Sequence, residues 1–133
     1  MIHEEICTYE VCKLAKEKGF NEYVEAFYAE DCNTPHSQGP EKWNEYKDRY
    51  AAPTQCLLQR WLREEKKMYV CPIIISDYED DFHPDIVYWS FIILNTESGD
   101  SIYREYERID DKRFATYELA LEDALKYALE NLV

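Results

Sequence analysis

Six side chains of metal-ligating type stand in one short acidic segment of the sequence, residues 77–85. One of them is Asp80, and the other five are the candidate metal ligands: Asp77, Glu79, Asp81, His83 and Asp85. Calcium and magnesium bind several oxygen ligands, and a turn of this composition supplies them. The spacing departs from the EF-hand loop, because phenylalanine and tyrosine occupy the positions of its required glycine and final glutamate. The other interpretation is a solvated turn whose charges discourage pairing along the edge of a hairpin. The pattern favours that second interpretation, so a metal-dependent enzyme using residues 77–85 is an alternative hypothesis.

Nucleophilic catalysis is the second chemistry to consider, because Cys32 and His36 lie close together in the sequence. A cysteine–histidine pair depends on its geometry in the fold, and no flanking motif supports this one. The three glycines, Gly19, Gly39 and Gly99, are scattered, which excludes a glycine-rich phosphate loop and the dinucleotide-binding fingerprint. The sequence therefore predicts no catalytic residue and no cofactor, and it favours a binding role over an enzymatic one.

The aromatic content points to binding, because twelve tyrosines and three tryptophans are more than a small core must hold. Both residue types offer rigid contact area with a polar tip and are enriched at binding hot spots. Five of them stand among charged residues and are the predicted partner-binding residues: Trp43, Tyr46, Tyr50, Tyr103 and Tyr106. The alternative is that they cover the edges of the core. Stacking on single-stranded nucleic acid would require a basic groove, which the composition does not favour.

The charge of the chain restricts its partners. Its 133 residues include 15 basic and 28 acidic side chains, for a net charge of −13. Phosphate backbones and anionic membranes attract clusters of lysine and arginine, so neither is expected as a direct partner. The simplest interpretation of the acidity is solubility. The sharper interpretation is an acidic surface that imitates nucleic acid or docks on a basic protein.

The cysteines and the apolar runs predict a compartment. Five cysteines without a C-x-x-C pair argue against a disulfide framework and against a zinc finger. Two of them, Cys56 and Cys71, lie in apolar segments and are interpreted as small core residues of a reducing cytosol. The first residues do not have the pattern of a signal peptide, and no apolar run is long enough for a membrane span. We therefore expect a soluble cytoplasmic protein.

Three segments have the periodicity of helices. The first is expected at about Tyr9–Lys18, after Thr8 as its N-cap. The central one is expected to begin with Pro53 in its first turn and to present an apolar stripe of Leu57, Leu58, Trp61 and Leu62. The last follows Thr116 and has one continuous apolar face: Tyr117, Ala120, Leu121, Ala124, Leu125, Ala128, Leu129 and Leu132.

Four segments have the composition of strands: 23–28, 68–75, 86–94 and 102–109. In the second, Tyr69, Cys71, Ile73 and Ile75 should face one way, and Pro72 marks an edge strand or a bulge. The segment Ile86–Leu94 is apolar on both faces. This pattern predicts a central strand that is either covered on both sides or part of a partner surface.

The fold class that follows is α+β, with a small, mainly antiparallel sheet of three or four strands and about three helices on one face. At this length the chain is expected to form a single domain, residues 1–133. Residues 29–50 are polar and punctuated by Pro35, Gly39 and Pro40, so they are predicted to form a loop-rich insertion. Within it, Glu41–Tyr50 is the candidate for a short helix.

Three stretches of the chain resemble a known family. Residues 8–20 read Thr-Tyr-Glu-Val-Cys-Lys-Leu-Ala-Lys-Glu-Lys-Gly-Phe, and residues 52–64 read Ala-Pro-Thr-Gln-Cys-Leu-Leu-Gln-Arg-Trp-Leu-Arg-Glu. Together with the final Thr116–Leu121 motif, they resemble small uncharacterised proteins carried by phages and mobile elements of gut bacteria. The resemblance covers most of the chain outside residues 29–50. It implies an accessory protein of a bacterial cytoplasm and brings no catalytic residues, because that family has no established activity.

The function expected from these observations is that of a non-catalytic protein-interaction module, an accessory protein of a phage or mobile element with a protein as its partner. The first alternative is an acidic inhibitor or nucleic-acid mimic that blocks a basic host protein. Salt separates the two, because it weakens an ionic interface steeply and an aromatic one little. A homodimer is also compatible with the sequence, since the apolar Ile86–Leu94 segment fits a strand that pairs two copies.

Overall fold

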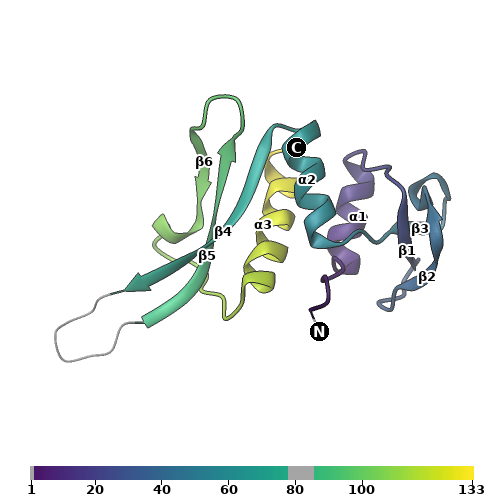
Figure 1. Ribbon diagram of the computed structural model, residues 1–133, viewed down its shortest axis with the longest axis horizontal. Helices are drawn as coiled ribbons and strands as arrows, with labels where there is room; N and C mark the ends of the chain where they lie inside the picture. Colours follow the sequence, from purple (N-terminus) through teal and green to yellow (C-terminus); the bar gives the residue numbers. More distant parts are fainter. Residues whose placement is uncertain (1, 78–85) are drawn as a thin grey trace.

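Strand pairing divides the chain into two three-stranded antiparallel sheets (Figure 1). The computed structural model describes residues 2–77 and 86–133. The first sheet, in the order β2-β1-β3, consists of β1 (Val24–Ala29), β2 (His36–Glu41) and β3 (Arg49–Ala51). The second, in the order β4-β5-β6, consists of β4 (Met68–Asp77), β5 (Ile86–Asn95) and β6 (Ser101–Arg104).

Three helices lie between the two sheets (Figure 1): α1 (Tyr9–Glu17), α2 (Gln55–Glu65) and α3 (Tyr117–Asn131). Helices α2 and α3 pack on the second sheet, whereas α1 packs on β3 and on α3. Two 3-10 turns, η1 (Trp43–Glu45) and η2 (Glu105–Glu107), complete the described elements. The predicted α+β class is confirmed. The strands, however, form two sheets where the sequence analysis expected one of three or four strands.

Two strands of the first sheet arise from the segment predicted to be loop-rich, residues 29–50. This segment returns to β1 twice, once as β2 and once as β3. The short helix expected at 41–50 is only the single turn η1, and the chain re-enters the sheet as β3 after residues 46–48. The Asn44 side chain explains this, because it donates to Phe20 O at 2.6 Å and accepts from the Ala51 N–H at 2.7 Å. Bonds of this kind compete with a continuing helix.

Threonine side chains begin all three α-helices, at Thr8, Thr54 and Thr116. Each Oγ1 accepts a hydrogen bond from the backbone N–H three residues later, at 3.4, 3.2 and 3.1 Å respectively. The predicted caps of the first and last helices are therefore confirmed. The prediction for the central helix was wrong, because α2 begins at Gln55 and Pro53 lies before the Thr54 cap and not in the first turn.

One hydrophobic core joins the two sheets through the helices. From β5, Phe91 and Ile93 are fully buried, and they meet the apolar face of α3, on which Leu125 and Leu129 are also fully buried. Pro72 lies on β4, which is an edge strand. This agrees with the prediction from its missing backbone N–H. Because β5 is the middle strand of its sheet, the prediction of a central strand at Ile86–Leu94 is confirmed.

The cysteines that fill the core are not the two that the sequence suggested. Cys7 and Cys12 are fully buried, whereas Cys56 is exposed on α2 and Cys71 is half-buried on β4. Helix periodicity explains the difference, because Cys56 lies on the side of α2 that faces solvent. The hydroxyl of Tyr28 donates to Cys7 O at 2.7 Å and closes this part of the core.

Stability at high pH should depend on Tyr28. Burial, followed by the nearby thiols of Cys12 and Cys7, raises the pKa of its hydroxyl from 10.0 to about 12. Above pH 10 the unfolded chain releases this proton more readily than the folded chain, so the free energy of unfolding should fall as the pH rises from 10 to 12. Urea unfolding of the wild type and of Tyr28→Phe across this range measures the effect. We expect a shallower fall in Tyr28→Phe, and an identical fall would contradict the assignment.

Candidate interaction surfaces

Trp43, the first predicted partner-binding residue, is in the core. It is 6% exposed, its Nε1–H donates to Val24 O at 2.9 Å, and its ring centre lies 4.5 Å from that of Phe27. The expectation that Trp43 belongs to an exposed recognition surface is therefore wrong. Charged neighbours in the sequence misled the prediction, because η1 turns the indole inward while the neighbouring side chains stay partly or fully exposed.

Two more of the predicted residues, Tyr46 and Tyr50, lie at or near the turn between η1 and β3. The guanidinium of Arg49 lies 4.6, 5.2 and 5.1 Å from the ring centres of Phe27, Trp43 and Tyr46. Tyr46 closes this arrangement from outside and stays exposed. Tyr50 is half-buried in β3, and its ring packs edge-on against that of Tyr9 on α1. A partner role for Tyr46 and Tyr50 stays a prediction.

The remaining two predicted residues lie at the other sheet. Tyr103 stacks on Tyr127 of α3 with ring centres 3.8 Å apart, and its hydroxyl donates to the buried carboxylate of Glu105. Burial, followed by this bond to Glu105, raises the pKa of Tyr103 to about 12. Tyr106 is half-buried in η2. The five predicted aromatic residues therefore divide between the two ends of the molecule and do not form one surface.

The residues considered for chemistry are not brought together. Cys32 Sγ donates to Thr34 O at 3.6 Å, and the His36 ring lies against Phe27, so the cysteine and histidine do not pair. Asp77 ends β4, and the other four predicted metal ligands lie outside the described residues: Glu79, Asp81, His83 and Asp85. Within 2–77 and 86–133, no group of three or more His, Cys, Asp or Glu side chains could hold a metal ion.

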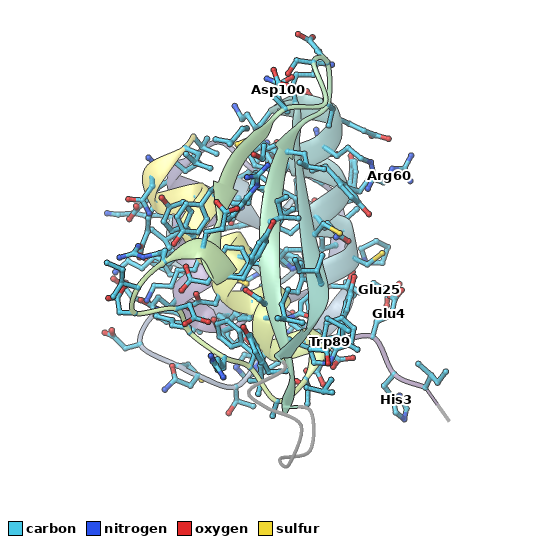
Figure 2. The ribbon with its side chains drawn as sticks, turned by 90° about the vertical axis from the view of Figure 1, so that its left-hand side faces the viewer. His3, Glu4, Glu25, Arg60, Trp89 and Asp100 are labelled. Atoms are coloured by element: carbon cyan, nitrogen blue, oxygen red, sulfur yellow. The ribbon has the colours of Figure 1, made fainter. Side chains whose placement is uncertain are left out.

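One face of the second sheet has no helix against it among the described elements. The register of β4 and β5 places eight side chains there, and we call them the outer face: Tyr69, Cys71, Ile73, Ile75, Tyr88, Ser90, Ile92 and Leu94. Figure 2 looks onto this face, and the helices lie behind the sheet. The prediction that the four β4 residues face one way is confirmed, and the structure shows that this way is outward.

The outer face is apolar at its centre and carries cations around it. Six of its eight side chains are half-buried, while Tyr88 and Ser90 are buried. The guanidinium of Arg113 lies 4.4 Å from the Tyr88 ring centre, and that of Arg63 lies 6.0 Å from the Tyr69 ring centre. An apolar sheet face bordered by polar groups is typical of a protein-binding surface.

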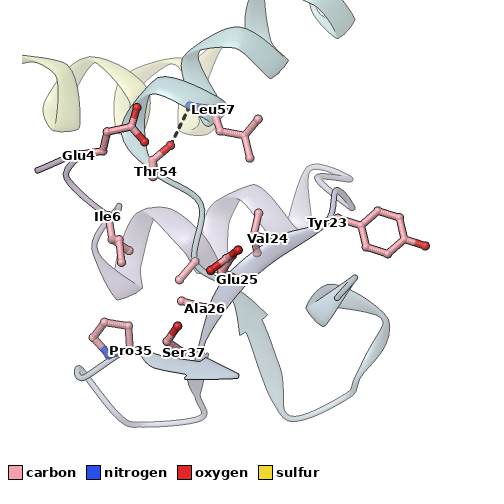
Figure 3. A pocket seen from close by; sticks show the side chains of 11 residues that line it. Glu4, Ile6, Tyr23, Val24, Glu25, Ala26, Pro35, Ser37, Thr54 and Leu57 are labelled. Carbon is pink, nitrogen blue, oxygen red and sulfur yellow. Dashed lines mark hydrogen bonds between the residues drawn. The ribbon is translucent and has the colours of Figure 1, made fainter. Parts of the chain in front are cut away.

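A groove of about 550 Å³ lies at the end of the molecule that carries the first sheet (Figure 3). Its walls come from the N-terminal segment, β1, β2 and the start of α2. Two backbone bonds hold the N-terminal segment in place: the Cys7 N–H donates to Pro53 O at 2.9 Å, and the Gln55 N–H donates to Glu5 O at 2.8 Å. These two bonds hold Glu4 among the residues that line the groove.

The second carboxylate of the groove comes from an irregularity in the first sheet. Val24 pairs with Glu41 and Ala26 pairs with Ser37, so residues 38–40 of β2 face Glu25 alone. Such irregularities bend a strand and change the direction of a side chain. Figure 3 shows Glu25 on β1 among the lining side chains, with Glu4 beside the start of α2. Neither glutamate belongs to a motif, so the sequence alone carries no signal for either.

Comparisons with known proteins do not place the chain in a family. No model of a protein family matches the chain, no curated protein matches it, and no solved structure matches it. The resemblance to phage and mobile-element proteins therefore stays a prediction. In the part of the chain that the structure describes, no helix has both the length and the apolar character of a membrane span.

Proposed function

We propose that this chain is a non-catalytic protein-interaction module that docks its partner on the outer face. The observation that carries the proposal is the row of half-buried apolar side chains on β4 and β5 with no described helix over it. The sequence alternatives for the apolar β5 segment were complete coverage or a partner surface. The three helices all lie on the other side of this sheet, which supports the second alternative (Figure 1).

The physical basis of docking is the apolar area that a partner would remove from water. Fully burying an isoleucine or leucine side chain contributes roughly 1.5–3 kcal/mol. Ile73, Ile92 and Leu94 are already partly covered by their neighbours, so each would contribute part of that amount. A contact of this kind loses little affinity at high salt, because its free energy is not ionic.

The test compares two neighbouring isoleucines on opposite faces of β4. Ile73 belongs to the outer face, whereas Ile74 points to the other side and is 57% exposed there. The tagged wild type, Ile73→Asp and Ile74→Asp are each used to capture partners from a bacterial lysate at low and high salt. We expect a partner that survives high salt, is lost with Ile73→Asp and is retained with Ile74→Asp.

The melting temperature of each variant controls for loss of folding. If Ile73→Asp does not fold, Ile73→Thr keeps a β-branched side chain and removes part of the apolar area. Loss of capture with both isoleucine variants alike would overturn the proposal. A partner released by salt from the wild type would favour the acidic-inhibitor alternative. We propose the bacterial cytoplasm as the place of this interaction, on the basis of the family resemblance.

A further inference from the structure

We infer that the groove between the N-terminal segment, the first sheet and α2 binds a lysine or arginine side chain of a basic partner protein. This inference concerns a second surface, separate from the outer face. The groove is lined by the N-terminal segment, the first sheet and the start of α2, and the helices lie between the first sheet and the second (Figure 1). It therefore stands or fails independently of the proposed function.

The lining of the groove is negatively charged. Glu4 and Glu25 are the charged residues of its lining, and both are exposed. Neither carboxylate has a hydrogen-bond or ion-pair partner within residues 2–77 and 86–133. The nearby ammonium group of Lys42 lies over the Tyr23 ring, 5.3 Å from its centre, at the rim of the groove. The groove thus presents negative charge without a bound cation of its own chain, and the whole chain carries −13.

The floor and two walls of the groove are apolar. Val24, Ala26 and Ala52 are buried there, and the partly exposed side chains of Ile6 and Leu57 form apolar walls. A small inorganic cation would gain no binding free energy from contact with these apolar side chains. Lysine and arginine combine an apolar stem with a charged head, so the stem can lie on the floor while the head meets a carboxylate. The volume of about 550 Å³ is sufficient for such a side chain.

The position of the groove favours a protein as the source of this cation. Strand β2 is an edge strand, and its residue Ser37 forms one wall together with Pro35, which precedes the strand. An extended segment of a partner can therefore run along this edge while its side chain enters the groove. Strong net acidity also attracts a basic protein over distance and speeds its association.

The experiment is a titration of the ¹⁵N-labelled full chain, followed by NMR, with the acetylated and amidated tripeptide Ala-Lys-Ala. We expect shifts of backbone amides around the groove, including Ile6, Ala26 and Ala52. The same tripeptide with norleucine in place of lysine keeps the stem and removes the charge. We expect it to bind about tenfold more weakly, which corresponds to the loss of one charge-assisted hydrogen bond.

A matched pair of variants makes the test specific. Glu4→Gln with Glu25→Gln should weaken binding of the lysine peptide at least about tenfold. Glu17→Gln with Glu97→Gln changes the net charge equally at exposed positions outside the groove, and it should leave binding unchanged. All four carboxylates are exposed, so the folded state should persist in both variants. No shift at the groove amides, or equal binding by both variants, would overturn the inference. Ile73→Asp should leave the titration unaffected, which separates this result from failure of the proposed function.

Discussion

Replacing Leu125 with aspartate is expected to lower the free energy of unfolding by at least about 3 kcal/mol. The side chain is fully buried on the face of α3 that packs on β4 and β5. The substitution removes apolar contacts from the middle of the core and places a carboxylate where no water reaches it. The measurement is the midpoint of urea unfolding, with the slope of the transition fitted separately for each protein.

A control on the same helix separates burial from helix propensity. Leu119 is 55% exposed on α3, so Leu119→Asp makes the same chemical change in contact with solvent. It also lies near the start of the helix, where a negative charge is favourable. We expect Leu119→Asp to change stability by less than about 1 kcal/mol. Similar losses in the two variants would contradict the placement of α3 between the sheets.

The second large effect is expected for Trp43→Ala, at about 3–5 kcal/mol of unfolding free energy. This substitution removes the ring that packs on Phe27 and Arg49, and it leaves Val24 O without its donor. Trp43→Phe keeps most of the ring contact and loses the hydrogen bond, so we expect a cost of about 1–2 kcal/mol. Denaturant unfolding of both variants gives the comparison.

These two tryptophan variants also decide between the two roles considered for this residue. A recognition residue would be nearly neutral for folding and costly for binding, whereas a core residue would show the reverse. A cost below about 1 kcal/mol for Trp43→Ala would contradict the burial of the indole. Tyr46 offers the contrast, because it borders the same aromatic group and is 45% exposed.

Features that depend on neighbours in the sequence were predictable. Thr8 and Thr116 indicated the starts of two helices, and the apolar face of the last helix agreed with its burial over six residues. Pro72 indicated an edge strand, because its backbone has no N–H to donate. These predictions succeed because capping, helical periodicity and proline chemistry act within a few residues of the chain.

Features that depend on strand pairing were not predictable. The pattern of residues 29–50 does not reveal that β2 and β3 both pair with β1, because the alternation of a strand does not name its partner. The outer face and the groove follow from the same pairing. Glu25 faces the groove because β2 bulges opposite it, and Glu4 does so because the N-terminal segment pairs beside Pro53.

The amino-acid sequence by itself determined the α+β class, the helix positions and the strong negative charge, since these follow from composition and from local periodicity. Only the tertiary structure decided that there are two sheets, that Trp43 is buried and that Tyr69, Cys71, Ile73 and Ile75 of β4 face outward. The physical reason is that burial of a side chain depends on which distant segment covers it. That contact is made by residues far apart in the chain, and no local pattern encodes it.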